Sequence, residues 1–259
     1  MHADAARING KRNSSYAGAA SEPRITLFCI PHAGGGASAY RNWASALGPQ
    51  IAVRVLQLPG RESRFREPVL TELDTVLADL FRAVAPDTAR PFALFGHSMG
   101  ALLAFELSQM LRNDIGRAPA HLFVSACRAP HCPQIAEPCS TLPQPEFVAA
   151  VTRRYGGIPA SILADDGFMA AMLPAMRADF GILERYRAAA RPQLDCPISA
   201  FGGRHDTAAP RSYLETWSKY TSSEFSLEMF DEGHFYLQSQ RSIMAQKILG
   251  SLNKCAAEM

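Results

Sequence analysis

The feature that most constrains the fold is a regular alternation of short apolar runs with helical patterns. Six runs of strand length are rich in aliphatic and aromatic residues, at 24–30, 51–58, 91–95, 121–126, 197–201 and 224–230. Between the second and third runs, and again between the third and fourth, apolar residues recur at the spacing of one helix face. Strands joined through helices lie parallel and cross over with a right hand. We therefore predict an α/β fold with a mostly parallel central sheet and helices on both faces.

The stretch at about 132–191 interrupts this alternation. It begins with a proline-rich segment and continues with two helical patterns, and we expect Pro174 to kink the second. A sheet does not need such an insertion, and helical insertions often cover a site as a lid. We predict a lid here; an insertion that only extends the core remains the alternative.

The two ends of the chain differ from its middle. Residues 1–24 are rich in Ala, Asn, Ser and Gly and lack a hydrophobic period, so we expect a disordered tail. The predicted domain spans 25–252, and 253–259 is expected to form a C-terminal tail. Neither a signal peptide nor a run long enough to cross a membrane is recognisable, which favours a soluble, cytoplasmic protein.

The charge balance excludes two classes of partner. The chain has 26 Lys and Arg against 24 Asp and Glu, a net charge of +2, and its hydrophobic fraction of 47% is ordinary. The excess positive charge lies within residues 1–24, so the rest of the chain is neutral overall. We therefore expect neither nucleic acid nor a membrane surface as a partner.

Cysteines and histidines form no recognisable disulfide or metal pattern. The six cysteines include no C-x-x-C pair, and Cys29 lies inside an apolar run, so we expect reduced thiols rather than a disulfide framework. His97, His121 and His131 lack the spacing of metal ligands and are interpreted as structural. We expect no metal and no redox cofactor.

A nucleophile motif, Gly-His-Ser-Met-Gly, stands at 96–100. Gly-x-Ser-x-Gly alone is a weak signal, but here an apolar strand leads into it and an amphipathic helix leaves it. This context is typical of a strand–turn–helix elbow that exposes the serine in a strained conformation. The sequence thus predicts Ser98 as a nucleophile at the amino terminus of a helix.

A serine needs a base and an acid, which follow it in this fold class at strand ends, acid first. Asp206 comes shortly after the strand at 197–201, and His234 shortly after the strand at 224–230. We assign His234 as the general base and Asp206 as the acid that orients it. Asp195, which precedes its strand, and Glu232, two residues from His234, are the alternatives for the acid.

An oxyanion hole should combine the Met99 N–H with one N–H from the loop after the first strand, and Ala33 is the expected donor. That loop holds three glycines at 34–36. A phosphate cradle is the alternative, but neither Gly-x-Gly-x-x-Gly nor a Gly-Lys-Ser/Thr ending is present.

The chain as a whole resembles the type II (external, editing) thioesterases that accompany polyketide synthases and nonribosomal peptide synthetases. Five segments carry the resemblance: Pro-His-Ala-Gly-Gly at 31–35, Leu-Pro-Gly-Arg-Glu at 58–62, Gly-His-Ser-Met-Gly at 96–100, Leu-Pro-Ala-Met-Arg-Ala-Asp-Phe at 173–180 and Gly-His-Phe-Tyr-Leu at 233–237. The resemblance covers about residues 24–250. It implies an α/β-hydrolase fold with a helical lid, and a monomer that hydrolyses acyl groups from the phosphopantetheine arm of carrier proteins.

That resemblance carries the family's triad onto Ser98, Asp206 and His234, and its oxyanion hole onto the N–H groups of Met99 and Ala33. A stand-alone esterase or lipase on small soluble esters would use the same residues and stays open. A non-catalytic binding protein of the same fold is a third possibility, which an intact triad argues against.

Two clusters are candidates for substrate or partner contacts. One is a set of methionines on a lid helix that either lines a tolerant acyl channel or packs the lid on the core: Met169, Met172 and Met176. The other is a set of arginines after the second strand that either meets an acidic carrier protein or the pantetheine phosphate, or is a solvated charge run: Arg61, Arg64 and Arg66.

Overall fold

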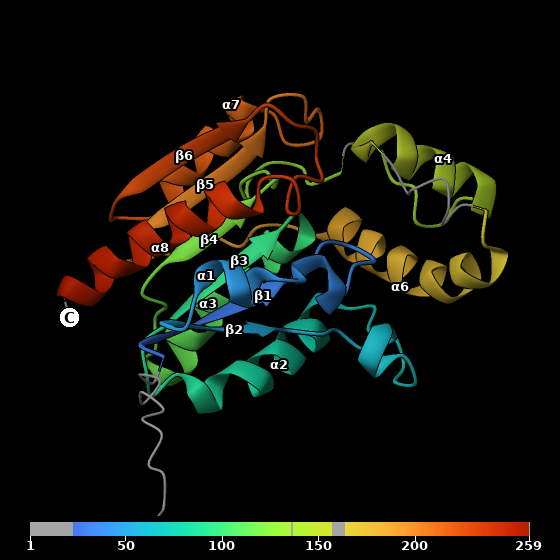
Figure 1. The fold of residues 1–259 in the computed structure, drawn as a ribbon. Coiled ribbons are helices and arrows are strands. Elements are labelled where there is room, and N and C mark those ends of the chain that lie inside the picture. The colour runs from blue at the N-terminus through green and yellow to red at the C-terminus, as the bar shows by residue number, and fades with distance from the viewer. Residues whose placement is uncertain (1–22, 136, 157–163, 259) are drawn as a thin grey trace, which may run out of the picture.

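The computed structural model describes residues 23–135, 137–156 and 164–258. The described chain forms three layers, with one sheet between two layers of helices, and a pair of helices beside them (Figure 1). Of the predicted N-terminal tail, residues 1–22 lie outside the described residues.

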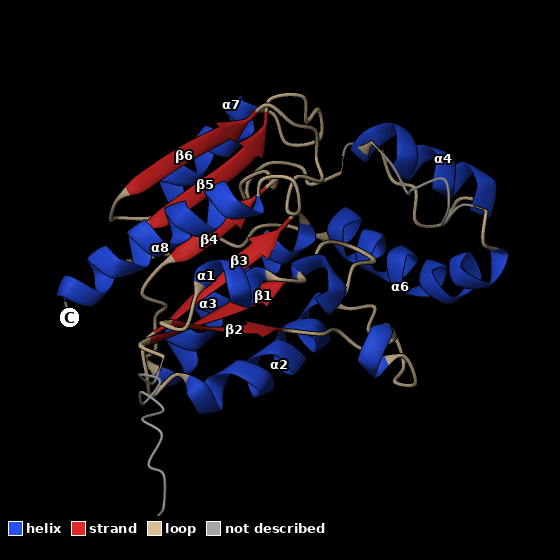
Figure 2. Ribbon diagram, in the orientation of Figure 1, coloured by secondary structure: helices blue, strands red, loops and turns tan. Residues whose placement is uncertain are grey.

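The sheet has six strands, and every neighbouring pair is parallel, which confirms the predicted mostly parallel α/β sheet (Figure 2). In chain order the strands are β1 (Ile25–Ile30), β2 (Ile51–Val55), β3 (Phe92–His97), β4 (Leu122–Ser125), β5 (Ile198–Gly203) and β6 (Phe225–Phe230). Their order across the sheet is β2-β1-β3-β4-β5-β6. The chain thus goes outward from β1 to β2 and then returns to the other side of β1. Open α/β sheets bind ligands at the carboxyl ends of the strands beside such a reversal, here between β1 and β3.

The alternation of side chains along the strands produces two cores. In β1, Leu27 and Cys29 face one side, where α1 (Trp43–Leu47) and α8 (Arg241–Glu258) cover the sheet. The alternate residues of the same strand face the other side, where α2 (Leu73–Val84) and α3 (Met99–Ile115) pack. Because both faces are covered, β3 is buried along its whole length, as expected for a central parallel strand.

Within the described part of the predicted insertion at about 132–191 lie two long helices, α4 (Gln144–Tyr155) and α6 (Asp166–Arg185). Figure 1 shows the pair side by side, beyond the carboxyl ends of the strands. We call these two helices the lid. They share a small apolar core of their own, in which Phe147 of α4 meets Phe180 of α6 edge to face, with ring centroids 5.6 Å apart. Pro174 lies inside α6, which continues through it to Arg185.

The remaining elements are short: α7 (Arg211–Leu214) and four 3-10 helices, at Ala37–Tyr40, Glu62–Arg64, Ala85–Asp87 and Glu215–Tyr220. One prediction is corrected at the carboxyl end, where α8 continues to Glu258, so residues 253–258 extend a helix and do not form a separate tail. All six cysteines are free thiols. No helix in the described part of the chain is long and apolar enough to cross a membrane.

Candidate active site

Ser98 occupies the turn between β3 and α3 with φ 55° and ψ −123°, a backbone conformation that residues other than glycine rarely adopt. The elbow is closed so tightly that its glycines have no room for a side chain. A Cβ on Gly96 would lie 2.0 Å from the Gly100 carbonyl oxygen, and a Cβ on Gly100 would lie 2.1 Å from the Ile30 carbonyl oxygen. The Ser98 N–H donates to the Ser125 carbonyl at 2.7 Å, which ties the strained residue to β4.

His234 and Asp206 form a buried pair. His234 Nδ1 lies 2.7 Å from Asp206 Oδ2, and both residues are only 4% exposed. The other Asp206 oxygen, Oδ1, accepts the backbone N–H groups of Ala208 at 2.9 Å and Ala209 at 3.2 Å. The carboxylate is therefore fixed on both sides, and it fixes the ring of His234 in turn.

The structure brings Ser98 and His234 together, since both line one small pocket over the carboxyl ends of the strands. His234 Nε2 is buried and has no hydrogen-bond partner among the described residues. Nδ1 is engaged by Asp206, so Nε2 is the ring nitrogen left to take a proton from a neighbouring hydroxyl.

The alternatives for the acid are placed elsewhere. Asp195 is exposed and precedes β5, at the opposite end of the strand from His234. Glu232 accepts a hydrogen bond from Gln240 Nε2 at 2.9 Å. Of these carboxylates, Asp206 is the one that the structure gives to His234.

A second imidazole, His97, lies beneath His234, with the ring centroids 5.4 Å apart. His97 Nδ1 is hydrogen-bonded to Ser125 Oγ at 2.9 Å, and Ser125 Oγ to the Tyr236 hydroxyl at 2.8 Å. Burial, and then the nearby imidazole of His234, hold the pKa of His97 well below its usual value. His97 is thus neutral at pH 7 and adds no positive charge beside His234.

The loop at 31–36 follows β1, and we call it the glycine loop. It lies on the opposite side of the Ser98 elbow from β6, the strand that precedes His234. Its turn is closed by the Gly35 N–H, which donates to the His32 carbonyl at 2.9 Å. Within the described ranges, no protein atom accepts the Ala33 N–H. Met99 is the first residue of α3, so its N–H has no acceptor within the helix. Both predicted oxyanion donors are therefore free of competing protein acceptors.

Tyr155, the last residue of α4, is a site residue that sequence reasoning missed. Its ring centroid lies 4.7 Å from that of His234, and it lines the pocket beside Ser98. Burial raises the pKa of its hydroxyl to about 12, so the ring is neutral. The helical period predicted the helix but contains no signal for a contact with a residue 79 positions away.

The structure places the three arginines that were predicted as contacts in different environments. Arg61 is 7% exposed and paired with Asp179 of α6, so the expectation that it meets a carrier protein is corrected. Arg64 is partly buried between Glu67 and Asp79. Arg66 is exposed. A buried guanidinium that already has a carboxylate partner is not available to a second protein.

The three methionines that were predicted as contacts also lie in different environments. Met169 and Met176 are 4% exposed and belong to the apolar core of the lid, as the packing alternative expects. Met172 is partly exposed and lines a surface hollow together with Phe168 and the glycine loop.

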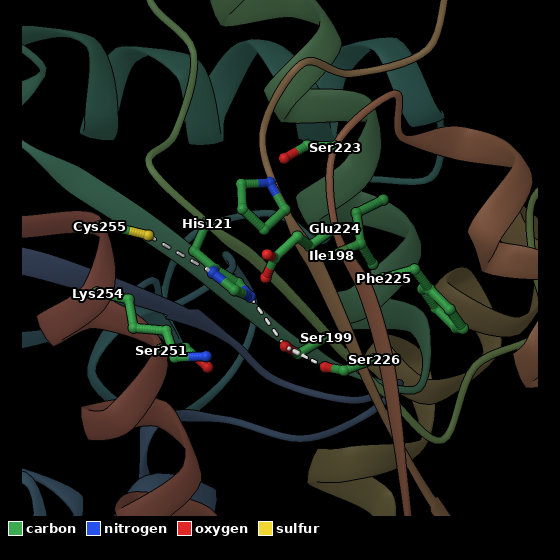
Figure 3. Close-up of a pocket in the computed structure, with 11 residues that line it drawn as sticks. His121, Ile198, Ser199, Ser223, Glu224, Phe225, Ser226, Ser251, Lys254 and Cys255 are labelled. Carbon is green, nitrogen blue, oxygen red and sulfur yellow. Dashed lines mark hydrogen bonds between the residues drawn. The ribbon is translucent and has the colours of Figure 1, made fainter. Parts of the chain in front are cut away.

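A larger pocket lies at the opposite, amino-terminal edge of the sheet, against α8, and it holds none of the triad candidates (Figure 3). Its volume is about 230 Å³. His121 forms its floor, with Nε2 2.9 Å from Ser199 Oγ, and Ser199 in turn contacts Ser226. No three metal-binding side chains cluster anywhere in residues 23–135, 137–156 and 164–258.

Comparison with known proteins gives one consistent fold and family. A family model described as a thioesterase domain matches residues 25–252. The linear gramicidin dehydrogenase LgrE of Brevibacillus parabrevis is 40% identical over 224 residues, with 85% of each chain covered. The gramicidin S biosynthesis protein GrsT of Aneurinibacillus migulanus is 38% identical over 226 residues, with 87% of this chain and 88% of the relative covered.

Solved structures agree with this fold. The thioesterase RedJ from the prodiginine pathway of Streptomyces coelicolor superposes with a TM-score of 0.82 at 34% identity, covering 90% of this chain and 87% of RedJ. The type II thioesterase BorB from the borrelidin biosynthetic cluster gives a TM-score of 0.78 at 34% identity, covering 90% and 94%. The name of LgrE describes a dehydrogenase, whereas the family model and both of these structures describe thioesterases.

Proposed function

This chain belongs to the thioesterase domain family, and from that premise we propose that it removes acyl groups from the phosphopantetheine arm of carrier proteins by way of an acyl-Ser98 intermediate. As a member of that family it is a hydrolase of thioesters. The observation that carries the proposed mechanism is the buried Asp206–His234 pair, whose free Nε2 lines the same pocket as the strained Ser98.

In the first half of the reaction, Ser98 Oγ attacks the thioester carbonyl and His234 Nε2 takes its proton. Asp206 holds the ring through Nδ1 and stabilises the imidazolium that forms. The N–H groups of Met99 and Ala33 receive the negative charge on the carbonyl oxygen. The pantetheine sulfur then leaves and receives the proton that His234 holds, so His234 is neutral again before water enters. Because a thiolate is a better leaving group than an alkoxide, stabilising the oxyanion matters more here than protonating the leaving sulfur.

In the second half, a water molecule takes the place of the thiol. His234 removes its proton, the hydroxide attacks the acyl-Ser98 ester, and the same two N–H groups stabilise the second tetrahedral oxyanion. Ser98 recovers its proton from His234 and the free acid departs. The residues that act in the first half of the reaction act again in the second, and water is the only co-reactant.

Carrier proteins are the proposed partners because relatives act in pathways that use them. GrsT is named for gramicidin S biosynthesis, and BorB is a type II thioesterase from a borrelidin cluster. A role in clearing stalled or wrongly primed synthases follows for this chain. Since the chain beyond residue 24 is neutral overall, carrier recognition must rely on local surfaces, and Arg66 is the exposed basic residue of the predicted arginine cluster.

The test is to load a carrier protein with acetyl- or propionyl-phosphopantetheine and follow its deacylation by intact mass. The wild-type enzyme should release the acyl group, and Ser98→Ala should not. Trapping of the acyl group on the wild-type enzyme as a mass increment at Ser98 would support the proposed intermediate. Rapid cleavage of nitrophenyl esters with the acyl carrier untouched would contradict the proposal and favour an esterase of small substrates.

A further inference from the structure

The lid is joined to the sheet domain by a buried ion pair. Asp179 of α6 is fully buried, and Arg61, in the loop after β2, is 7% exposed. Two guanidinium nitrogens reach the two carboxylate oxygens, Nη1 to Oδ2 at 2.5 Å and Nη2 to Oδ1 at 3.1 Å. Arg61 Nε also donates to the Pro59 carbonyl at 3.3 Å. This is a fork-to-fork pair of fixed geometry, with its own anchor on the loop.

The same carboxylate reaches the glycine loop. The Gly34 N–H donates to Asp179 Oδ2 at 2.7 Å. Gly34 has φ +72°, and a Cβ there would lie 2.2 Å from Cγ of Met176, three residues before Asp179 on α6. One turn of the lid helix thus fixes both the hydrogen bonding and the contact surface of Gly34.

These contacts determine how the neighbouring peptide groups are oriented. The peptide group between Ala33 and Gly34 is held at both ends, because His32 Nδ1 lies 3.0 Å from the Ala33 carbonyl while Asp179 accepts the Gly34 N–H. The preceding peptide group, between His32 and Ala33, is held at its carbonyl by the Gly35 N–H. Its remaining polar group is the Ala33 N–H, the proposed oxyanion donor.

We propose that Asp179, held in place by Arg61, is a positioning residue for the oxyanion hole: through Gly34 it fixes the direction in which the Ala33 N–H points. This inference rests on the proposed function, since it takes Ala33 as the oxyanion donor. It also assigns a role to two of the motif segments that the triad leaves unused, those at 58–62 and 173–180, which meet through this pair.

We call the contacts of Asp179 with Arg61 and with Gly34 the clamp, and the glycine loop needs such an anchor. Three successive glycines have more backbone freedom than any other tripeptide, so the loop cannot hold an N–H in one direction by itself. An oxyanion donor is effective only when it is already aimed at the charge that develops. A buried ion pair, in contrast, is not required for stability, because apolar side chains of similar volume can replace it. The pair is therefore better explained by what it orients.

The first test compares three single variants on a small nitrophenyl acyl ester, with rates expressed per active site. Asp179→Asn should lower kcat about 10- to 100-fold with KM nearly unchanged, because the misplaced N–H stabilises only the transition state. Arg61→Lys keeps a positive charge beside the Asp179 carboxylate and should lower kcat less than about tenfold. Glu184→Gln is the matched control: Glu184 also lies on α6 and accepts backbone N–H groups, of Cys139 at 2.6 Å and Ser140 at 2.9 Å, but within the lid. It should retain kcat.

The second test separates positioning from folding. The double variant Arg61→Met with Asp179→Leu removes both charges, so neither is left buried without its partner, and it takes the acceptor away from the Gly34 N–H. It should fold with wild-type cooperativity in urea yet keep the low kcat. The inhibition constant of an alkyl boronic acid, whose tetrahedral adduct on the serine places an oxygen in the oxyanion hole, should rise by the same factor as kcat falls. Wild-type kcat in the double variant or in Asp179→Asn, or an unchanged boronate constant beside a lowered kcat, would overturn the proposal.

Because these rates use a small ester, they do not depend on carrier recognition. If the enzyme leaves acyl carriers untouched, the proposed function fails. The ratio of kcat between Asp179→Asn and the wild type on the small ester still tests the clamp. If Ser98→Ala retains activity, the nucleophile itself is wrong, and that result is visible before any of the clamp variants is measured.

Discussion

The ring of Tyr155, at the end of lid helix α4, lies 4.7 Å from the ring of His234, so the lid covers the proposed catalytic base. The pocket that Tyr155, His234 and Ser98 line has a volume of only about 20 Å³, room for about one water molecule. Because so little space is left beside Ser98, we expect Tyr155 to move away from His234 when an acyl thioester enters.

Shortening Tyr155 should open the site. We expect Tyr155→Ala to accelerate labelling of Ser98 by a fluorophosphonate severalfold, because the side chain that fills the entrance is gone, while Tyr155→Phe should label at the wild-type rate because the ring contact remains. Labelling is measured by intact mass against time. Equal rates for the alanine variant and the wild type would show that Tyr155 does not limit access.

The acid of the proposed triad can be tested by a matched pair of amide substitutions. Asp206→Asn should lower kcat on the order of 10⁴-fold, because an amide no longer holds the His234 tautomer that leaves Nε2 free to accept a proton. Asp195→Asn changes an exposed carboxylate of the same strand region and should lower kcat less than about twofold. Steady-state kinetics on one ester suffice for both, and equal losses would refute the assignment of Asp206.

The elbow glycines should be intolerant of even a methyl group. Gly100→Ala places a Cβ 2.1 Å from a backbone oxygen that cannot move without shifting β1, so we expect a loss of about 3 kcal/mol in the free energy of unfolding. Gly250→Ala is the control, since this glycine is exposed in α8 with nothing within 4 Å. There, stability should rise by about 0.5–1 kcal/mol. Urea unfolding measures both, and a neutral Gly100→Ala would contradict the close packing of the elbow.

Stability should fall as the pH drops from about 6.5 to 4. Burial lowers the pKa of His121 to about 4, whereas an unfolded chain has a histidine pKa near 6.5, so between these values the unfolded state binds the extra proton. The contribution of His121 is fully present above pH 6.5 and diminishes by about 3 kcal/mol as the pH reaches 4.

The variant that isolates this effect is His121→Gln, which keeps a hydrogen-bonding group beside Ser199 Oγ but does not titrate. Cys255 Sγ, 3.9 Å from His121 Nδ1, and Glu224 and Lys254 in the same pocket remain in both proteins (Figure 3). Urea unfolding at pH 6.5 and 4.5 should show a smaller decrease for the variant. Identical decreases would assign the acid sensitivity to other groups, of which buried His97 is the first candidate.

Local sequence patterns predicted the strands well, because the apolar runs are short and helical patterns separate the second run from the third and the third from the fourth. All six predicted runs overlap a strand, although β3 and β5 continue two residues beyond their runs, and Ser98 stands at the predicted elbow between β3 and α3. The predictions that differ from the structure concern where strands and helices end. The run at 51–58 ends as a strand at Val55, and α8 continues beyond residue 252, because ends depend on neighbours that a local pattern does not include.

The arginine cluster shows why side-chain roles were harder to predict than elements. One short segment after β2 holds all three arginines, Arg61, Arg64 and Arg66, and they have the same charge. The sequence therefore offers no reason to treat them differently. Only the packing of α6 against that loop decides that Arg61 is buried on Asp179 while Arg66 stays in solvent. The burial of Met169 and Met176, and the partial exposure of Met172, depend on the tertiary packing of α6, in part against α4.

The sequence by itself was enough to predict the parallel sheet, the elbow with its serine and the chain order of the proposed serine, acid and base, because these depend on period, on glycine and on position at strand ends. The tertiary structure decided which residues contact one another across long stretches of the chain. Asp179 reaches Gly34, and Tyr155 reaches His234, through the docking of the lid on the carboxyl edge of the sheet. Such contacts depend on the relative placement of two packed units, which no local periodicity encodes.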